Sequence, residues 1–284
     1  MGENMKKLYI SDMDGTLLQS DGTLSPYTKA KLNELYDKGI PFAVATARSM
    51  VSAMPILDGV HFKAPIVLMN GVFVYDTETK KAVKYHEIPY SAIQKVLDIF
   101  YSHNLHPFMF LYGDDYKLSI KYTVFDNDGM KEFYDMRVDM LDGRFTQTDD
   151  MTIIPDEQHS VYINYYALPQ ILDPVVEKLK KIPEIGFAYY KDSYSDDWLI
   201  EIYSHTASKA NSAKCVKEIV GAGCITAFGD NLNDIKMLQG ADIAVAVSNA
   251  VSQVKEIADV IIGTNNEDSV VNFIAQNVDK TAEK

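Results

Sequence analysis

Apolar and polar residues form blocks along the first part of the chain. These blocks predict a strand, a helix and a second strand, in that order. Residues 7–10 form a short apolar run that is typical of a buried strand. Ser25 and Pro26 suit the cap and the first position of a helix, and Gly39 suits its end. The apolar run 41–46 then predicts a second buried strand. Strands this apolar favour a parallel sheet that helices cover on both faces.

This pattern is interrupted in the middle of the chain. Residues 65–69 predict a third core strand, and Asn70-Gly71 follows it as a turn signal. From about residue 84 to residue 195 the chain is rich in tyrosine and phenylalanine and has alternating runs that indicate antiparallel strands. An inserted α/β module with its own sheet, a cap domain, accounts for this change. Its expected strands include 108–112, 116–120 and 161–166, and its expected helices are 91–102 and 169–181.

The first pattern returns in the last third of the chain. We therefore expect an α/β fold: a doubly wound parallel-sheet (Rossmann-like) core with an inserted α/β cap domain that contains an antiparallel sheet. The predicted domains are 1–83 and 196–284 for the core and 84–195 for the cap. The expected elements of the returning core are a helix over 207–220 and strands over 224–228, 243–247 and 260–262.

Composition limits the classes of function. With 284 residues, 47% of them hydrophobic, the chain can bury a large core. Its formal net charge of −13 and its lack of any long basic run weigh against nucleic acid and anionic membranes as partners. No apolar stretch reaches the roughly 18 to 20 residues that span a bilayer. We expect a soluble cytoplasmic protein with Cys215 and Cys224 as reduced thiols. The oligomeric state stays open.

Two carboxylates follow the first predicted strand. Asp12 and Asp14 lie just beyond its end, where ligand sites form in open α/β sheets. Carboxylates this close repel one another, so a cation is expected with them, and Mg²⁺ suits a few oxygen ligands together with a substrate phosphate. The alternative is that both residues merely cap the turn that contains Gly15.

A second acidic cluster follows another core strand. Asp230 comes directly after the apolar run 224–228, and Asp234 falls on the same face of the following helical turn. Because the carboxyl ends of parallel strands meet at one edge of a sheet, the two acidic loops can converge on one metal ion. The alternative is a solvated loop that caps a helix.

The net negative charge would repel a phosphate ester, so binding the ester requires local hydrogen-bond donors or a local positive charge. Thr46 follows the second strand, where its hydroxyl and nearby backbone N–H groups could hold a phosphate oxygen. Lys209 begins a helix of the returning core and could neutralise charge in a transition state. Taken alone, Lys209 would be an ordinary surface charge.

These residues, in this order, resemble the four motifs of the haloacid dehalogenase (HAD) superfamily. The motifs are the segment 12–18, Thr46, Lys209 and the segment 229–234. The size of the insert and the segment 69–71 ahead of it are similar to the Cof-type branch, which carries a large α/β (C2B-type) cap. The resemblance covers the whole chain and implies a Mg²⁺-dependent phosphatase of small phosphorylated metabolites.

The resemblance also implies a role for each motif residue. Asp12 is the implied nucleophile, and Asp14 the general acid to the leaving alcohol and then the base for water. The implied Mg²⁺ ligands are the carboxylates of Asp12 and Asp230 and the backbone carbonyl of Asp14. Thr46, Lys209 and Asn233 would contact the phosphoryl group, and Asp234 would orient Lys209 or a metal-bound water.

Two positions depart from the family pattern. Ala47 stands where the family usually has glycine, and residues 204–208 lack the usual proline and glycine before the lysine. Neither change removes a side chain that does chemistry. A sugar phosphate is the implied substrate class, with a flavin or pyridoxal phosphate open. The competing hypotheses are a phosphosugar mutase, a non-catalytic phosphometabolite-binding protein and, against the charge, a metal-dependent nuclease.

Overall fold

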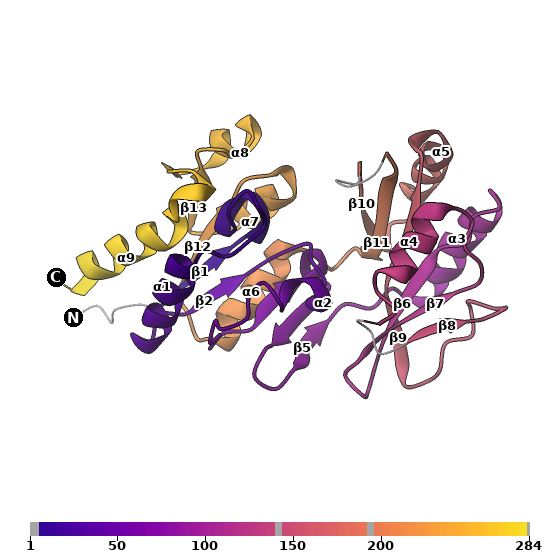
Figure 1. The fold of residues 1–284 in the computed structure, drawn as a ribbon, viewed down its shortest axis with the longest axis horizontal. Helices are drawn as coiled ribbons and strands as arrows, with labels where there is room; N and C mark the ends of the chain where they lie inside the picture. The colour runs from indigo at the N-terminus through magenta and orange to yellow at the C-terminus, as the bar shows by residue number, and fades with distance from the viewer. Residues whose placement is uncertain (1–5, 140–143, 192–195, 283–284) are drawn as a thin grey trace. The chain divides into compact units, whose positions relative to one another are not determined.

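The computed structural model describes residues 6–139, 144–191 and 196–282. The chain forms two compact units. Residues 1–84 together with 208–284 make up the core unit, and residues 85–207 make up the cap unit. Figure 1 shows the chain leaving the core unit once and returning to it once. The expected insertion is therefore present.

The core unit is built on a parallel sheet with the strand order β14-β13-β12-β1-β2. Leu8, Tyr9 and Ile10 are consecutive and all buried, so both faces of the central strand are covered. This confirms the predicted class of fold. The strands are β1 (Lys7–Ser11), β2 (Phe42–Val44), β12 (Cys224–Gly229), β13 (Ile243–Val247) and β14 (Val260–Ile262).

A small antiparallel sheet continues from the edge of β2. Ala45 makes a parallel bridge to Val67 in β3 (Ile66–Leu68). Strand β3 then pairs with β4 (Phe73–Asp76), which neighbours β5 (Lys81–Tyr85). The bridge sets the end of β2 beside the end of β3.

Helices pack against the core sheet (Figure 1). Ser25 caps the first helix as predicted, because its Oγ accepts a hydrogen bond of 2.9 Å from the Thr28 N–H. The last helix packs on β12 through an edge-to-face contact between Phe273 and Phe228. The helices are α1 (Pro26–Asp37), α2 (Met50–Ala53), α6 (Lys209–Ile219), α7 (Ile235–Gln239), α8 (Ser252–Ile257) and α9 (Ser269–Ala282).

The cap unit has a sheet of its own with the strand order β10-β11-β9-β6-β7-β8. Its strand pairs are antiparallel except β7 with β8. The strands are β6 (Phe108–Gly113), β7 (Leu118–Tyr122), β8 (Phe145–Gln147), β9 (Gln158–Ala167), β10 (Ile185–Lys191) and β11 (Trp198–Ser204). The helices are α3 (Tyr90–Tyr101), α4 (Asp128–Asp135) and α5 (Pro169–Leu179).

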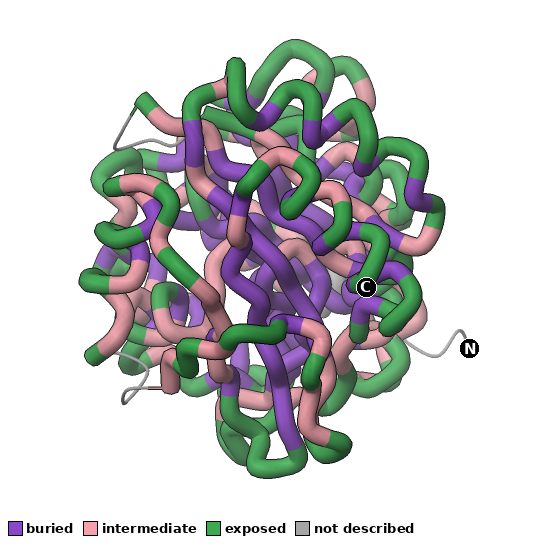
Figure 2. Tube along the Cα trace, turned by 90° about the vertical axis from the view of Figure 1, so that its right-hand side faces the viewer, coloured by how far each residue is buried: buried purple, intermediate pink, exposed green. Residues whose placement is uncertain are grey.

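Many of the cap's aromatic residues fill its interior. The ring of Phe108 lies 5.0 Å from that of Phe133 and 6.1 Å from that of Phe145. Tyr112 and Tyr165 are buried. Figure 2 shows the buried parts of the chain in purple, in the interior of the tube trace, with exposed parts in green around them. This part of the aromatic content therefore serves packing.

The end of the cap differs from the sequence-based boundary. The expected boundary at residue 195 lies outside the described residues. Beyond it, residues 198–204 form β11, which pairs with β10 and β9 of the cap sheet. The core resumes at Ser208 rather than at residue 196. The run 198–202 is as apolar as a core strand, so composition does not separate the two sheets.

Within the described ranges, no helix combines the length and apolar character that a membrane span requires. Cys215 and Cys224 are both free thiols.

Candidate active site

Asp12 lies where β1 ends. Its backbone N–H donates a hydrogen bond of 3.0 Å to the Phe228 carbonyl of β12, and its side chain is buried. The chain then turns tightly at Gly15, whose φ is +75°. A Cβ at Gly15 would lie 2.5 Å from Asp230 Oδ2, so only glycine fits beside this carboxylate. The turn thus brings the two acidic loops into contact.

Asp230 and Asp234 follow β12 in a short turn. Asp234 Oδ2 accepts hydrogen bonds from the N–H groups of Asp230 and Asn231, at 3.1 and 3.2 Å. Thr16 Oγ1 donates to Asp230 Oδ1 at 2.8 Å. Asp12, Asp230 and Asp234 each offer one carboxylate oxygen, and these three oxygens lie within 4.8 Å of one another. The two acidic loops therefore converge, as the parallel sheet predicts.

Lys209 joins the two loops from the first turn of α6. Ser208 caps this helix by accepting a hydrogen bond of 3.0 Å from the Asn211 N–H. The Lys209 ammonium donates to Asp12 Oδ1 at 2.6 Å and to Asp234 Oδ1 at 2.7 Å. Its side chain is only 2% exposed. Lys209 is therefore a buried bridging cation rather than a surface charge.

The cluster carries more negative than positive charge. The three carboxylates and the one ammonium leave a formal charge of −2. Burial, followed by the nearby Asp234 carboxylate, raises the pKa of Asp12 well above its usual range despite the Lys209 ammonium. Burial alone would lower the pKa of Lys209, but its two carboxylate partners outweigh burial and raise it. Burial also raises the pKa of Asp230. The cluster therefore favours a further cation.

The donor set fits Mg²⁺. The side chains that converge offer carboxylate oxygens, which are the ligands that a hard divalent cation prefers. A charge of +2 would neutralise the −2 of the cluster. Asp12 and Asp230 are the residues that would hold the ion, with the backbone carbonyl of Asp14 as the third expected ligand.

Asp14 lies at the edge of this cluster, and its side chain is 50% exposed. Its carboxylate accepts two hydrogen bonds from the Arg48 guanidinium, at 2.8 Å from Nε and 2.6 Å from Nη2. The fork-like pairing fixes the orientation of the carboxylate. Sequence reasoning did not assign Arg48 a role, although its position two residues after Thr46 at a strand end was a usable signal.

Thr46 is fully buried in the loop after β2. Its Oγ1 accepts a hydrogen bond of 3.0 Å from the Arg48 N–H, which leaves its hydroxyl proton available to another acceptor. Asn233 behaves differently. It is exposed in the turn Leu232–Asp234, and its side chain has no hydrogen bond within the described part of the chain. The predicted contact of Asn233 with a phosphoryl group stays a prediction.

Two further residues support the site. Thr16 holds Asp230, and Asn249 Nδ2 donates to the Gly15 carbonyl at 2.8 Å. Asn249 follows β13, so it comes from a third strand end on the same edge of the sheet. This position is the signal that could have identified it.

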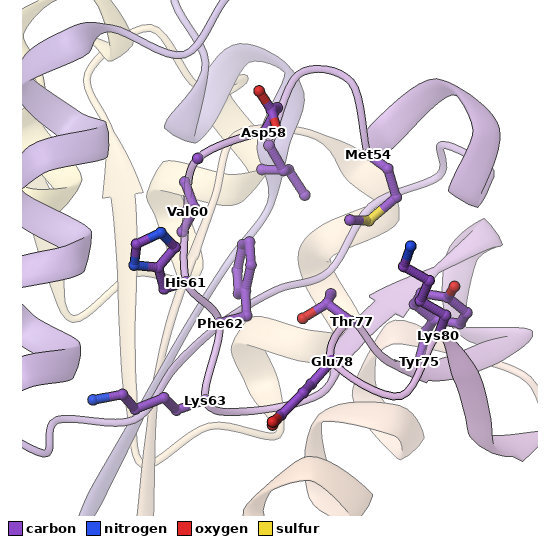
Figure 3. A pocket seen from close by; sticks show the side chains of 12 residues that line it. Met54, Asp58, Val60, His61, Phe62, Lys63, Tyr75, Thr77, Glu78 and Lys80 are labelled. Atoms are coloured by element: carbon purple, nitrogen blue, oxygen red, sulfur yellow. The ribbon is translucent and has the colours of Figure 1, made fainter.

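The core unit also contains a cavity that is separate from the cluster of Asp12, Asp230, Asp234 and Lys209. This cavity of about 740 Å³ lies between the segment 54–63 and the β4–β5 hairpin. Figure 3 shows His61, Phe62 and Tyr75 among the side chains of its wall. None of the predicted site residues lines it. We assign it no role in catalysis.

The core fold and its site define a class of protein: an α/β protein with a buried carboxylate and lysine centre at the carboxyl edge of a parallel sheet. The chain belongs to the haloacid dehalogenase-like hydrolases, whose sequence profile matches residues 9–274. This confirms the resemblance stated from the motifs.

Relatives match over nearly the whole chain. A 5-amino-6-(5-phospho-D-ribitylamino)uracil phosphatase of Bacillus subtilis is 27% identical, over 96% of this chain and 98% of its own length. A pyridoxal phosphate phosphatase of Escherichia coli is 24% identical, over 93% and 95%. The crystal structure of a haloacid dehalogenase-like hydrolase from Bacteroides thetaiotaomicron has a TM-score of 0.74 at 22% identity, over 95% and 98%. The structural likeness concerns the fold.

Proposed function

We propose that this protein is a Mg²⁺-dependent phosphatase of small phosphorylated metabolites that works through a phosphoaspartyl intermediate. The observation that carries the proposal is the buried Lys209 ammonium bridging Asp12 and Asp234 at the sheet edge. A buried ammonium keeps the Asp12 carboxylate oriented and offsets the charge of an arriving phosphate. The named phosphatases among the relatives support the same class of reaction.

In the first step, a carboxylate oxygen of Asp12 attacks phosphorus. One Asp12 oxygen accepts the Lys209 hydrogen bond, and we propose the other as the nucleophile. A bond forms between this oxygen and phosphorus, and the bond from phosphorus to the ester oxygen breaks. The ester oxygen leaves with the electron pair and takes a proton from Asp14. Bound Mg²⁺ would supply further charge neutralisation for the phosphoryl oxygens.

In the second step, a water oxygen attacks phosphorus and gives its proton to Asp14. The bond from phosphorus to Asp12 breaks, the Asp12 carboxylate is restored, and inorganic phosphate leaves. Asp14 must exchange its pairing with Arg48 for the reacting oxygens during this cycle. The Thr46 hydroxyl has a proton to donate to a phosphoryl oxygen.

We propose sugar phosphates as the first substrate class. The relatives named for a phosphoribityl compound and for pyridoxal phosphate extend the set of candidates to polyol and cofactor phosphates. The net charge of −13 disfavours nucleic acid as a substrate. The free thiols suit a reducing compartment, and we propose the cytoplasm as the place of action.

The test is release of inorganic phosphate from a panel of sugar, polyol, nucleotide and cofactor phosphates, with Mg²⁺ or with EDTA. We expect hydrolysis of at least one small ester in Mg²⁺ and none in EDTA. Asp12→Asn should abolish turnover, and Asp21→Asn, at an exposed turn, serves as the matched control. No release from any ester by folded, Mg²⁺-loaded protein would overturn the proposal, whereas transfer of the phosphoryl group back to a sugar would indicate a mutase.

A further inference from the structure

Three consecutive residues after β3 have left-handed backbone conformations. The φ angles of Met69, Asn70 and Gly71 are 50°, 54° and 101°. Residues other than glycine and asparagine rarely adopt this region, and such conformations gather at functional sites where the surrounding structure holds them. Contacts with neighbouring segments must therefore hold the segment 69–71, here called the left-handed segment, in this conformation.

On one side, the left-handed segment binds the loop that carries Thr46. The Asn70 N–H donates to the Thr46 carbonyl at 3.0 Å, and the Met69 N–H donates to the Arg48 carbonyl at 3.0 Å. The Thr46 N–H in turn donates to the Val67 carbonyl at 2.9 Å. The loop from Thr46 to Arg48 is thus held at both ends by main-chain hydrogen bonds.

On the other side, the left-handed segment packs against the start of α6. A Cβ at Gly71 would lie 2.3 Å from the carbonyl carbon of Ser208, the capping residue next to Lys209. Ser212 Oγ donates a hydrogen bond of 3.0 Å to the Gly71 carbonyl. The first turn of the Lys209 helix is therefore seated directly on this backbone.

The contribution of Asn70 to these contacts runs through its main chain. Within the described residues, its Oδ1 is buried without a hydrogen-bond partner, and its side chain makes no hydrogen bond there. Glycine, which has no Cβ, adopts the left-handed region freely, and asparagine adopts it more often than alanine does. Replacing Asn70 by glycine therefore keeps the backbone and removes no hydrogen bond.

We infer that Asn70 is a positioning residue for phosphoryl transfer. Its left-handed backbone sets the Thr46 loop and the Lys209 helix at the separation that one phosphoryl group requires. The inference rests on the proposed function, because Thr46 and Lys209 are the proposed contacts of that group. It adds a residue to the site that touches neither the reacting atoms nor the carboxylate cluster.

The test compares Asn70→Ala with Asn70→Gly in the full-length protein. Asn104→Ala is the matched control, because Asn104 also has a left-handed backbone (φ 56°) but lies in the cap unit. Each variant is assayed for kcat and KM on the best phosphate ester of the panel, for inhibition by inorganic phosphate, and for its melting temperature. Assays are run well below the lowest melting temperature.

We expect Asn70→Ala to lower kcat by about tenfold or more and to weaken inhibition by phosphate, since misplacement by about 1 Å is costly in catalysis. Asn70→Gly and Asn104→Ala should stay within about threefold of the native kcat, because neither disturbs the site's backbone. Native kcat in Asn70→Ala, or an equal loss in Asn70→Gly, would overturn the inference.

Failure of the proposed function gives a different result. If the native protein hydrolyses no ester, binding of inorganic phosphate measured by calorimetry replaces kinetics as the readout. Weaker phosphate binding by Asn70→Ala than by Asn70→Gly would then support the positioning role without turnover. Equal phosphate affinity in the two variants would overturn it.

Discussion

At the scale of single residues, the Lys209 ammonium dominates the electrostatics of the site. It has two carboxylate partners, and its side chain is 2% exposed. Removing one partner from a buried ion pair leaves the other charges uncompensated, which typically costs about 3 to 5 kcal/mol. Lys209→Met should therefore lower the free energy of unfolding by about that amount, and it should lower kcat at least about 100-fold.

Denaturant titration and steady-state kinetics measure the two effects of this change. Lys38→Met is the matched control, since the Lys38–Glu34 pair is 2.8 Å long but half exposed. Such a surface pair contributes less than about 1 kcal/mol. Native turnover in Lys209→Met would contradict the role assigned to the ammonium.

Unlike Lys209, Asp14 should contribute to turnover but little to the free energy of unfolding. Its side chain is half exposed and pairs with Arg48, so little folding energy depends on its charge. As the proposed general acid and base, it should matter far more in turnover. Asp14→Asn should lower kcat about 100- to 10,000-fold and change the free energy of unfolding by less than about 1 kcal/mol. A variant that retains turnover while losing stability would show that Asp14 is structural.

The sequence allowed some site residues to be found and not others. Asp12 and Asp230 stand at the ends of apolar strands, where topology alone brings side chains together. Lys209 was placed by its order along the chain, and its burial comes only from the packing of α6. Arg48 and Asn249 act through loop geometry, which local patterns do not determine. Asn233 was also placed by its order along the chain, and its contact with a phosphoryl group stays a prediction.

At the scale of elements, β11 carries a buried acid within the cap sheet. Glu201 is 7% exposed, and Tyr162 and Tyr190 donate hydrogen bonds to it. Its Oε2 has no partner in the described part of the chain, and the facing Asn164 of β9 likewise has an unpartnered Oδ1. Burial raises the pKa of Glu201 from 4.5 to about 7. The folded state of the cap is therefore more stable when the Glu201 carboxyl is protonated.

This pKa predicts how cap stability depends on pH. The folded value lies above the unfolded one, so the folded state binds more protons between about pH 4.5 and 7, and stability falls as pH rises through that window. The loss should approach about 3 kcal/mol. Glu201→Gln should remove this pH-dependent loss of stability. The variant should be as stable as the native protein at pH 5 and more stable than it at pH 8.

Fluorescence of Trp198 measures this effect, because it is the one tryptophan in the sequence and lies in β11. Glu157→Gln, at an exposed position of the cap, is the matched control. If native and Glu201→Gln proteins lose stability in parallel between pH 5 and pH 8, the acid does not behave as described.

Elements were easier to predict than their assignment to units. The core strands and α1 follow directly from apolar runs and a capping residue. Strand β11 has the same apolar character as a core strand, and only its pairing with β9 and β10 places it in the cap. Helix α4 was not among the expected elements, because eight residues that include Gly129 give a weak helical pattern.

At the scale of the whole molecule, the charge of −13 opposes the arrival of an anionic substrate. Salt screens this repulsion over distances beyond about 8 to 10 Å, but it affects the buried cluster much less. Raising the ionic strength from about 20 to 150 mM should therefore lower KM for a phosphate ester about twofold or more and leave kcat unchanged. A KM that rises with salt would show that local positive charge, rather than the net charge, governs substrate encounter.

The most direct test of the central claim is to trap the phosphoryl group on Asp12. The native protein is mixed with Mg²⁺ and its best phosphate ester, quenched in acid and treated with borohydride, which reduces an aspartyl phosphate to homoserine. Trypsin then releases residues 8–29, and fragmentation in the mass spectrometer locates the change. We predict homoserine at position 12 alone, dependent on substrate and Mg²⁺. Phosphate release without any modification at Asp12, or modification at Asp14 instead, would contradict the account.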